Sequence, residues 1–297
     1  MTGPDQGFLL LTSTLGDPDR RPLTVAQFRG LAKRVQEAER DVSARDLEVA
    51  DLMALGYDQV MAERIFGLFS GTNSLREYLR RGESCDCVPI TRLNPLYPGA
   101  VRRRLGLDSP GVLWAKGDVT LLGLPAVAVI GSRDLQEQNR EFAEEAGRQI
   151  AKQGYVLVSG NARGADKCAQ EACLEAGGSV ISVVADSLES HALRPNVLYL
   201  SEDGFDLSFS PQRALSRNRV IHALGTRTLV AQCDLGKGGT WDGTVKNLRR
   251  GDSPVFCFCD GSPAMPELAD LGARLIPEKA LENLDALLPD ELNFMDR

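Results

Sequence analysis

The sequence predicts an α/β fold with a mostly parallel sheet, preceded by a small helical domain. From about Pro125 onward, short and continuously apolar runs such as AVAVIG alternate with amphipathic segments such as EQNREFAEEAGRQIAKQG. Before residue 88, the apolar positions instead follow helical spacing. Apolar strands that alternate with helices are typical of a parallel sheet covered on both faces.

The helical domain is expected over residues 1–87. In TVAQFRGLAKRVQEAE, Phe28, Leu31 and Val35 recur at the spacing of one helix face. Further short helices are predicted for DLEVADLMALG, DQVMAERIFGLFS and SLREYLRRG. Residues 88–297 form the second unit. It begins with a segment, residues 89–119, that four prolines predict to be an extended connector.

The second unit continues as a Rossmann-like alternation of strands and helices. Strands are predicted for AVAVIG, YVLVSG, SVISVVA, NVLYLSE, TRTLVAQC and PVFCFC. Helices are predicted for EQNREFAEEAGRQIAKQG, RGADKCAQEACLEAGG, PQRALSRNRVIHALG and GTWDGTVKNLRRG, and GARLIP and KALENLDALL close the pattern. In such sheets ligands bind at the carboxyl ends of the strands, near a switch in strand order, so the residues that follow each strand matter most.

Charge narrows the class of partner. The formal net charge of −7 and the pI of about 5.1 argue against a general nucleic-acid-coating protein. However, residues 211–250 hold eight basic and two acidic side chains, a local net of +6, whereas residues 260–297 hold nine acidic and three basic ones. We interpret the first stretch as a basic face that suits a polyanion; solvated helix faces are the alternative.

Other patterns argue against membranes, metals and common catalytic sites. No apolar stretch approaches the ~20 residues of a membrane span. The N-terminal MTGPDQGFLLLTST lacks the basic start of a signal peptide, so a cytoplasmic protein is expected. The seven cysteines form no CxxC pair with companion histidines, which predicts no metal site. His191 and His222 lie in no recognisable nucleophile–base arrangement, so we predict no catalytic residue.

Three glycine-containing loops follow predicted strands. They are residues 131–133 (GSR), 159–166 (SGNARGAD) and 236–240 (GKGGT). Backbone N–H groups at helix starts bind anions, and Arg133 and Arg163 could add charge-assisted bonds to phosphate. None of the loops has GxxxxGK[ST] or GxGxxG spacing. Each loop alone could be a plain turn, but three at one sheet edge indicate a phosphate site.

At these residues the chain resembles the DprA/Smf family (DNA-processing protein A), within the SLOG group of Rossmann-like domains. The resemblance runs from about Val88 to Pro277. It is carried in order by ITRLNPLYPGAVRRRL…PGVLWAKGD, AVAVIGSR, SGNARGAD…EAGG, RNRVIHALGTRTLVAQC and GKGGT. It implies single-stranded DNA binding without strong sequence preference, a homodimer, and loading of a RecA-type recombinase in DNA uptake and natural transformation, with no cofactor and no membrane.

The resemblance also implies which residues contact DNA phosphates. By motif match they would be Arg133, Ser159, Gly160, Arg163, Arg217, Arg219 and Lys237. The full set that we predict to bind DNA or phosphate adds Gly131, Ser132, Gly164, Asp166, Asn218, Gly238, Gly239 and Thr240. Arginine, lysine and helix-start N–H groups are the donors that phosphate contacts require. The chain departs from the family where GGTWDGTVKNL replaces a small-residue pattern, and we expect no winged-helix domain of the kind that often ends family members.

Two other function classes stay open. One is a SLOG-type nucleoside monophosphate phosphoribohydrolase, in which a PGGxGTxxE loop places a glutamate at the glycosidic bond. Aligned here, Gly243 stands at the glutamate position, and Asp242 lies one position away. Because acid–base catalysis needs a positioned carboxylate, we expect no enzyme. The other class is a nucleotide-sensing module, for example in phage defence.

Overall fold

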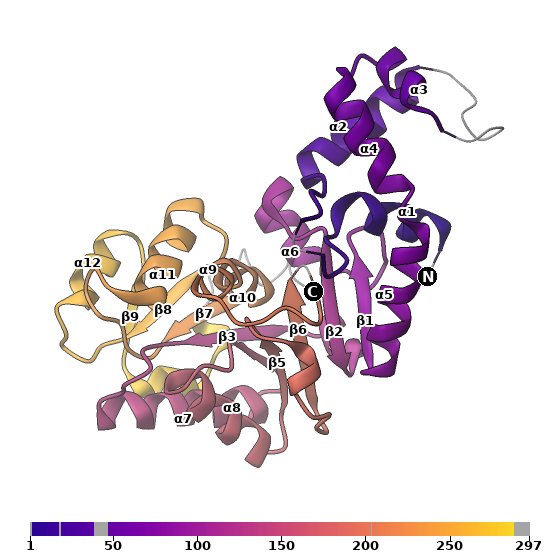
Figure 1. Cartoon of the computed structure of the whole chain (residues 1–297). Helices are drawn as coiled ribbons and strands as arrows, with labels where there is room; N and C mark the ends of the chain where they lie inside the picture. The colour runs from indigo at the N-terminus through magenta and orange to yellow at the C-terminus, as the bar shows by residue number, and fades with distance from the viewer. Residues whose placement is uncertain (1, 18, 39–46, 203, 288–297) are drawn as a thin grey trace.

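A computed structural model describes residues 2–17, 19–38, 47–202 and 204–287 of the chain. Over these residues, its frame is a nine-stranded sheet of order β1-β2-β6-β5-β4-β3-β7-β8-β9 (Figure 1). The strands are β1 (Cys87–Thr91), β2 (Val112–Gly117), β3 (Ala126–Ile130), β4 (Val156–Ser159), β5 (Ser179–Val183), β6 (Val197–Glu202), β7 (Arg227–Val230), β8 (Val255–Phe258) and β9 (Arg274–Ile276). The strands from β3 to β9 run parallel, and β2 pairs antiparallel with β1 and β6. The predicted mostly parallel α/β fold is confirmed.

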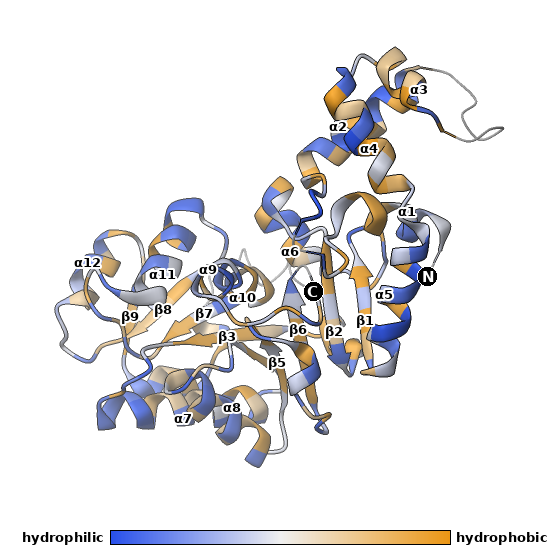
Figure 2. Cartoon of the chain, viewed as in Figure 1, coloured by the Kyte–Doolittle hydropathy of each residue, from blue (hydrophilic) through white to orange (hydrophobic). Residues whose placement is uncertain are grey.

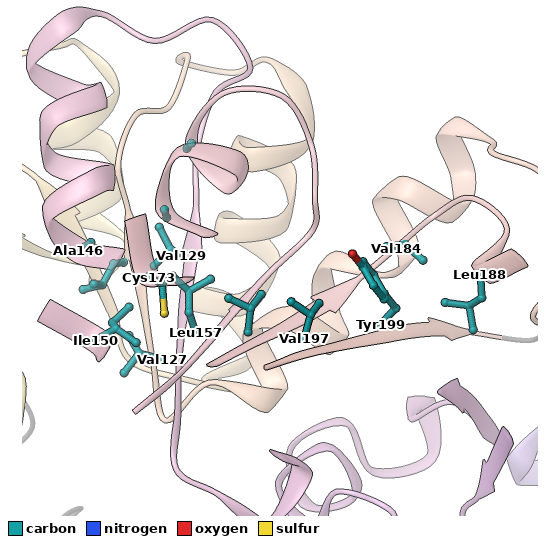
Figure 3. Close-up of a cluster of buried hydrophobic side chains, with 14 of the residues drawn as sticks. Val127, Val129, Ala146, Ile150, Leu157, Cys173, Val184, Leu188, Val197 and Tyr199 are labelled. Carbon is teal, nitrogen blue, oxygen red and sulfur yellow. The ribbon is translucent and has the colours of Figure 1, made fainter. Parts of the chain in front are cut away.

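Helices cover both faces of the sheet, which explains the continuously apolar strands. One face carries α7 (Glu137–Lys152) and α8 (Ala165–Glu175); the other carries α6 (Gly99–Leu105), α10 (Asn218–Leu224), α11 (Gly238–Arg250) and α12 (Ala264–Asp270) (Figure 1). Figure 2 shows hydrophobic strands between helices whose outer sides are hydrophilic. Figure 3 shows Val127 and Val129 of β3 beside Ala146 and Cys173 of the α7–α8 layer.

The segment expected to be an extended connector is instead part of the sheet. Residues 89–119 contribute most of β1, all of α6 and all of β2, and Trp114 of β2 is fully buried. Pro89 lies in β1, the edge strand of the sheet. Proline has no N–H group to donate, but on the solvent side of an edge strand there is no neighbouring strand to accept a hydrogen bond, so none is lost. The other prolines fall between the elements or at the start of α6, so they mark turns rather than an extended chain.

The first part of the chain is helical as far as the structure describes it. Its helices are α1 (Gly3–Thr12), α2 (Val25–Glu37), α3 (Val49–Ala54), α4 (Gln59–Phe69) and α5 (Thr72–Ser84). A small separate cluster includes Leu31, Leu52 and Ile65 from α2, α3 and α4. In contrast, α1 and α5 join the core of the sheet, because Tyr78 of α5 packs edge-on against Trp114 with ring centroids 5.2 Å apart. Residues 39 and 46 of the predicted helices lie outside the described residues.

Two further details position the site. The helix predicted for PQRALSRNRVIHALG is broken at Arg217 into α9 (Pro211–Ser216) and α10. At the amino ends of the strands, two 3-10 turns over residues 278–287 pack against α7 and β7. Residue 288 of the predicted KALENLDALL element lies outside the described residues. No helix among the described residues is both long and apolar enough to span a membrane.

Candidate functional site

The strand order reverses between β3 and β7. From β3 the chain continues outward through β4, β5 and β6, then returns to β7 on the other side of β3. A cavity of about 540 Å³ opens at the carboxyl ends of these strands, where α/β sheets bind ligands. Ten predicted site residues line it: Gly131, Ser132, Arg133, Asp166, Arg217, Asn218, Lys237, Gly238, Gly239 and Thr240.

The N-terminus of α11 forms one side of the cavity. Lys237 is its N-cap residue, and no side chain of the residues that the structure describes caps the first turn. The first N–H groups of a helix have no acceptor within the helix, and the helix dipole adds positive potential there. Thr240 Oγ1 donates to the Gly131 carbonyl over 2.9 Å, and Asn218 Nδ2 donates to the Gly239 carbonyl over 3.0 Å. These bonds fix the β3 loop, α10 and α11 around an anion-suited helix start.

A buried ion pair forms the back of the cavity. Arg217 Nη1 lies 3.9 Å from Asp166 Oδ2, and both residues are buried. Asp166 also accepts bonds from the backbone N–H groups of Gly160 and Ala162, over 3.0 and 3.2 Å. Burial raises the pKa of Asp166, although the Arg217 cation and the two N–H groups oppose that shift. Burial also lowers the pKa of Arg217, against the pull of Asp166.

Arg217 is not fully satisfied by this arrangement. Its Nε is buried and has no hydrogen-bond partner among the residues that the structure describes. Burying a polar group without a partner costs free energy, and more so for a charged group. The Nη groups of Arg217 make only the 3.9 Å ion pair with Asp166 among the described residues, so it is these groups that could donate to an anion in the cavity.

Two glycines of the 159–166 loop have a steric role rather than a direct place in the cavity. A Cβ atom at Gly160 would lie 1.3 Å from Arg217 Nη1, so only glycine lets the guanidinium cross this strand end. Gly164 has φ +87°, and a Cβ there would lie 2.4 Å from the Ser132 carbonyl oxygen. The close packing at these two glycines brings the β3 and β4 loops together, and the DNA contacts predicted for them stay predictions.

Three other predicted residues lie outside the cavity lining. Ser159 is fully buried and accepts a bond from Gln170 Nε2 over 2.5 Å. Arg163 is exposed and pairs with Asp134 over 2.8 Å. Arg219 bonds Glu202 and the Asp108 carbonyl, which ties α10 to the chain after α6. The structure does not bring these three side chains together with the others.

Gln232, which the sequence analysis did not single out, shapes the loop that carries Arg133. Its carbonyl accepts from the Ser132 N–H over 3.0 Å, and its Oε1 accepts from the Gln136 N–H over 2.8 Å. Its Nε2 donates to the Asp134 carbonyl over 3.1 Å. The sequence signal that could have identified this residue is a polar amide at the end of the apolar strand TRTLVAQC.

The basic stretch 211–250 does not form one face. Only Arg217 and Lys237 of its eight basic residues line the cavity. Arg227 lies at the opposite end of the sheet, Lys246 pairs with Asp242, and Arg250 pairs with Asp108. With Arg133, the lining holds three cations beside three acids, Asp134, Asp166 and Asp234. Of these acids, Asp166 faces Arg217, and Asp134 pairs with Arg163, which lies outside the lining. When Arg163 is included, the cations around the cavity outnumber the acids, and the site has a modest positive charge.

The geometry offers little to the glycosidase alternative. A Cβ at Gly243 would lie 3.3 Å from both Cβ and Nδ2 of Asn218, so α11 packs against α10 where a glutamate would be needed. Asp242 is outside the cavity lining and pairs with Lys246 over 2.7 Å. His222 is buried behind this contact, where burial lowers its pKa to about 4.

Comparison with known proteins gives a consistent set of relatives. A family profile described as DNA recombination-mediator protein A matches residues 89–280. The DNA processing protein DprA of Streptococcus pneumoniae is 33% identical over 203 residues, which cover 64% of this chain and 68% of that protein. DprA of Bacillus subtilis is 29% identical over 136 residues. The matches span 46% of the B. subtilis protein and 52% of Protein Smf of Escherichia coli, so the chain spans about half the length of these relatives.

Solved structures share the fold. The X-ray structure of S. pneumoniae DprA superposes with a TM-score of 0.70 at 23% identity, over 94% of this chain and 97% of that one. DprA of Helicobacter pylori, described as having a unique single-stranded DNA binding mode, gives a TM-score of 0.56 at 28% identity, over 66% of this chain and 94% of that one. The chain belongs to the DNA recombination-mediator protein A family, the DprA/Smf proteins.

Proposed function

We propose that this protein is a non-catalytic single-stranded DNA-binding protein that holds the phosphates of the strand in the cavity between β3 and β7. The observation that carries the proposal is Arg217, an arginine on the cavity wall whose Nη groups make only a 3.9 Å ion pair with Asp166 among the described residues. The uncapped start of α11 and the side chains of Arg133 and Lys237 face the same cavity. Together they offer charge-assisted donors of the kind that phosphate oxygens accept.

The same chemistry predicts binding without strong sequence preference. Phosphate contacts set the position and orientation of a nucleic acid and carry no direct information about its bases. The relatives named DNA processing proteins, and the single-stranded DNA binding described for the H. pylori protein, support this assignment. Loading of a RecA-type recombinase and formation of a homodimer rest on the family resemblance and stay predictions.

A salt titration tests the proposal. A labelled dT oligonucleotide and a duplex of equal length are titrated with the full chain at several salt concentrations. We expect the single strand to bind more tightly. Because three cations line the cavity, neutralising about three phosphates would give log K a slope near −2 against log salt, from about −0.7 per phosphate. Equal binding to the duplex, or a flat salt response, would contradict the proposal.

A second assay separates the binder from the hydrolase. The protein is incubated with AMP, CMP and GMP, and released base is measured against a heat-killed sample. We expect no release above that background, since Gly243 carries no carboxylate and Asp242 is turned to Lys246. Robust release that disappears in Asp242→Asn would establish the enzyme instead.

A further inference from the structure

A second group of arginines lies outside the cavity, on the segment that joins β1 to β2. Residues 89–107 hold four arginines and no acidic residue. Arg92 follows β1 directly, and Arg102 lies in α6. Arg102 Nη2 donates to the Arg92 carbonyl over 2.8 Å, and its guanidinium lies over the Tyr97 ring. Arg29 of α2 is close enough for its charge to act on Arg92. We call Arg29, Arg92 and Arg102 the second arginine cluster.

The charge of this cluster is not neutralised within the described ranges. None of its three arginines forms an ion pair with an acid there, and Asp108, the next acid along the chain from Arg102, pairs with Arg250 over 3.3 Å. Burial lowers the pKa of Arg92, and the like charges of Arg102 and Arg29 lower it further. Arg29 and Arg102 are exposed, so an anion can reach them. Cations gathered without counter-charges repel one another and attract a polyanion.

The second arginine cluster lies at the same edge of the sheet as the cavity. β6 runs parallel to β5, β2 runs antiparallel to β6, and β1 runs antiparallel to β2. The carboxyl end of β1, where Arg92 follows, is therefore at the edge where the cavity opens. The order β1-β2-β6-β5-β4-β3 puts five strand spacings between β1 and β3, or about 24 Å at about 4.8 Å per spacing.

One short turn joins the cluster to the wall of the cavity. This turn is η2 (Gly106–Asp108), which α2 contacts. Arg92 Nη1 donates to the Gly106 carbonyl over 2.7 Å, and Arg219 of α10 donates to the Asp108 carbonyl. Arg219 follows Arg217, which lines the cavity, by two residues. The two groups of cations are thus held in a fixed arrangement by the fold.

We propose that the second arginine cluster is a further phosphate subsite, which binds a single strand of DNA where it continues out of the cavity along the sheet edge toward α2. This inference rests on the proposed function. A strand that follows this path meets three cations in the cavity and three more in the cluster. At the ~3.4 Å per nucleotide of a stacked strand, about seven nucleotides cover the distance between the two sites. A strand of about four nucleotides reaches only one of them.

The test compares dT strands of two lengths, about 4 and about 16 nucleotides. Each is titrated at several salt concentrations against four full-length proteins, with fluorescence anisotropy as the readout. The proteins are the wild type, the double variant Arg29→Ala/Arg102→Ala, the single variant Arg29→Glu, and the matched control Lys152→Ala/Arg194→Ala. The control removes two exposed cations that precede β4 and β6, at the opposite edge of the sheet. Urea unfolding checks that each variant is folded.

We expect the wild type to bind the longer strand with a salt slope near −4, from about −0.7 for each of about six phosphates, and the shorter strand with the slope near −2 of the cavity alone. Arg29→Ala/Arg102→Ala should weaken binding of the longer strand about tenfold near physiological salt and reduce its slope by about 1.4. Arg29→Glu should weaken the longer strand about fourfold or more. Both should leave the shorter strand unchanged, and the control should match the wild type.

The outcomes separate this inference from the proposed function. Equal wild-type slopes for the two strands, or an equal effect of the double variant on both, would overturn the second subsite and leave binding in the cavity intact. If the double variant unfolds, Arg29→Glu decides in the same way, because Arg29 is an exposed helix residue. Failure of the wild type to bind either strand would overturn the proposed function, and the second subsite with it.

Discussion

Two buried arginines lie at opposite ends of the parallel sheet, and their surroundings differ. Arg227, at the start of β7, is 2% exposed and donates to the Leu284 carbonyl, Tyr155 Oη and Thr226 Oγ1. Arg217, between α9 and α10, is 8% exposed and borders the cavity with its Nε unpartnered among the described residues. The hydrogen bonds of the fold take the donors of Arg227, whereas the Nη groups of Arg217 make only the 3.9 Å ion pair with Asp166 among the described residues.

The comparison shows why burial alone does not identify a binding residue. A buried arginine whose donors are met stabilises the chain by joining distant segments, here β7 and the turns at residues 278–287. A buried arginine with a spare donor carries a cost that a ligand can remove. Four predictions test this distinction.

The largest expected effect concerns a third buried group, His222. Its Nε2 also has no hydrogen-bond partner within the described part of the chain, but His222 lies outside the cavity lining, so we expect it to affect stability and not binding. Burial lowers its pKa from 6.5 to about 4. The unfolded chain therefore takes up the proton first as pH falls. The stability that neutral His222 contributes is present above pH 6.5 and declines toward pH 4, by about 3 kcal/mol in total.

Urea unfolding of the wild type and His222→Gln at pH 7 and pH 4 measures this effect. The variant should lose less stability than the wild type over that interval. The same pH dependence in both proteins would show that His222 does not titrate as its burial suggests, and altered DNA affinity at pH 7 would show that it belongs to the site.

The next effect comes from Arg227→Lys. A lysine keeps the charge but cannot reach all the acceptors that the guanidinium bonds, so two or so buried hydrogen bonds are lost. We expect the free energy of unfolding to fall by about 2 kcal/mol. Chemical denaturation measures it, and binding of dT by the folded fraction should not change. Weakened binding with unchanged stability would reverse the roles assigned to the two arginines.

Arg217→Lys is the matched substitution at the cavity. The charge opposite Asp166 is kept, so the change in stability should be small, whereas the planar fork that grips a phosphate is lost. We expect dT affinity to fall roughly tenfold, about 1.4 kcal/mol. Fluorescence anisotropy checks it; a variant that binds as the wild type does would show that Arg217 is only structural.

The smallest effect is expected for the exposed cations at the cavity mouth. Lys237→Ala and Arg133→Ala should each weaken binding for all sequences alike and reduce the salt slope by about 0.7. Stability should hardly change, since exposed charges contribute little to it. Lys246→Ala, on the outer side of α11, is the matched control. A slope that stays the same in the double variant would remove these residues from the site.

Most strands of the parallel sheet could be predicted because the pattern that identifies each strand lies within a short stretch of sequence. A strand such as AVAVIG, buried on both faces, is recognisable without its neighbours. The pairing of β2 with β6 is not, because Leu113 opposes Glu202 across a gap that no local pattern spans. For the same reason, local patterns do not show that packing crosses the proposed boundary between residues 87 and 88, where Tyr78 on one side contacts Trp114 on the other.

The site was predictable where it depends on backbone. The three glycine loops do meet at one edge, because parallel strands bring their carboxyl ends together. The directions of the side chains could not be predicted. Arg219 stands two positions after Arg217, yet the helix directs its side chain toward Glu202. Gln232 was missed because it belongs to no motif, and only the folded chain shows what its side chain faces.

The hydrogen bonds that join the cavity loops have a kinetic consequence. Thr240 holds the β3 loop to α11, Asn218 holds α10 to α11, and Gln232 holds the loop that carries Arg133. A site assembled before its ligand arrives has little ordering left to complete on contact. The association rate is then set by diffusion and charge. Substitutions that weaken binding should therefore raise the dissociation rate of the complex much more than they lower its association rate.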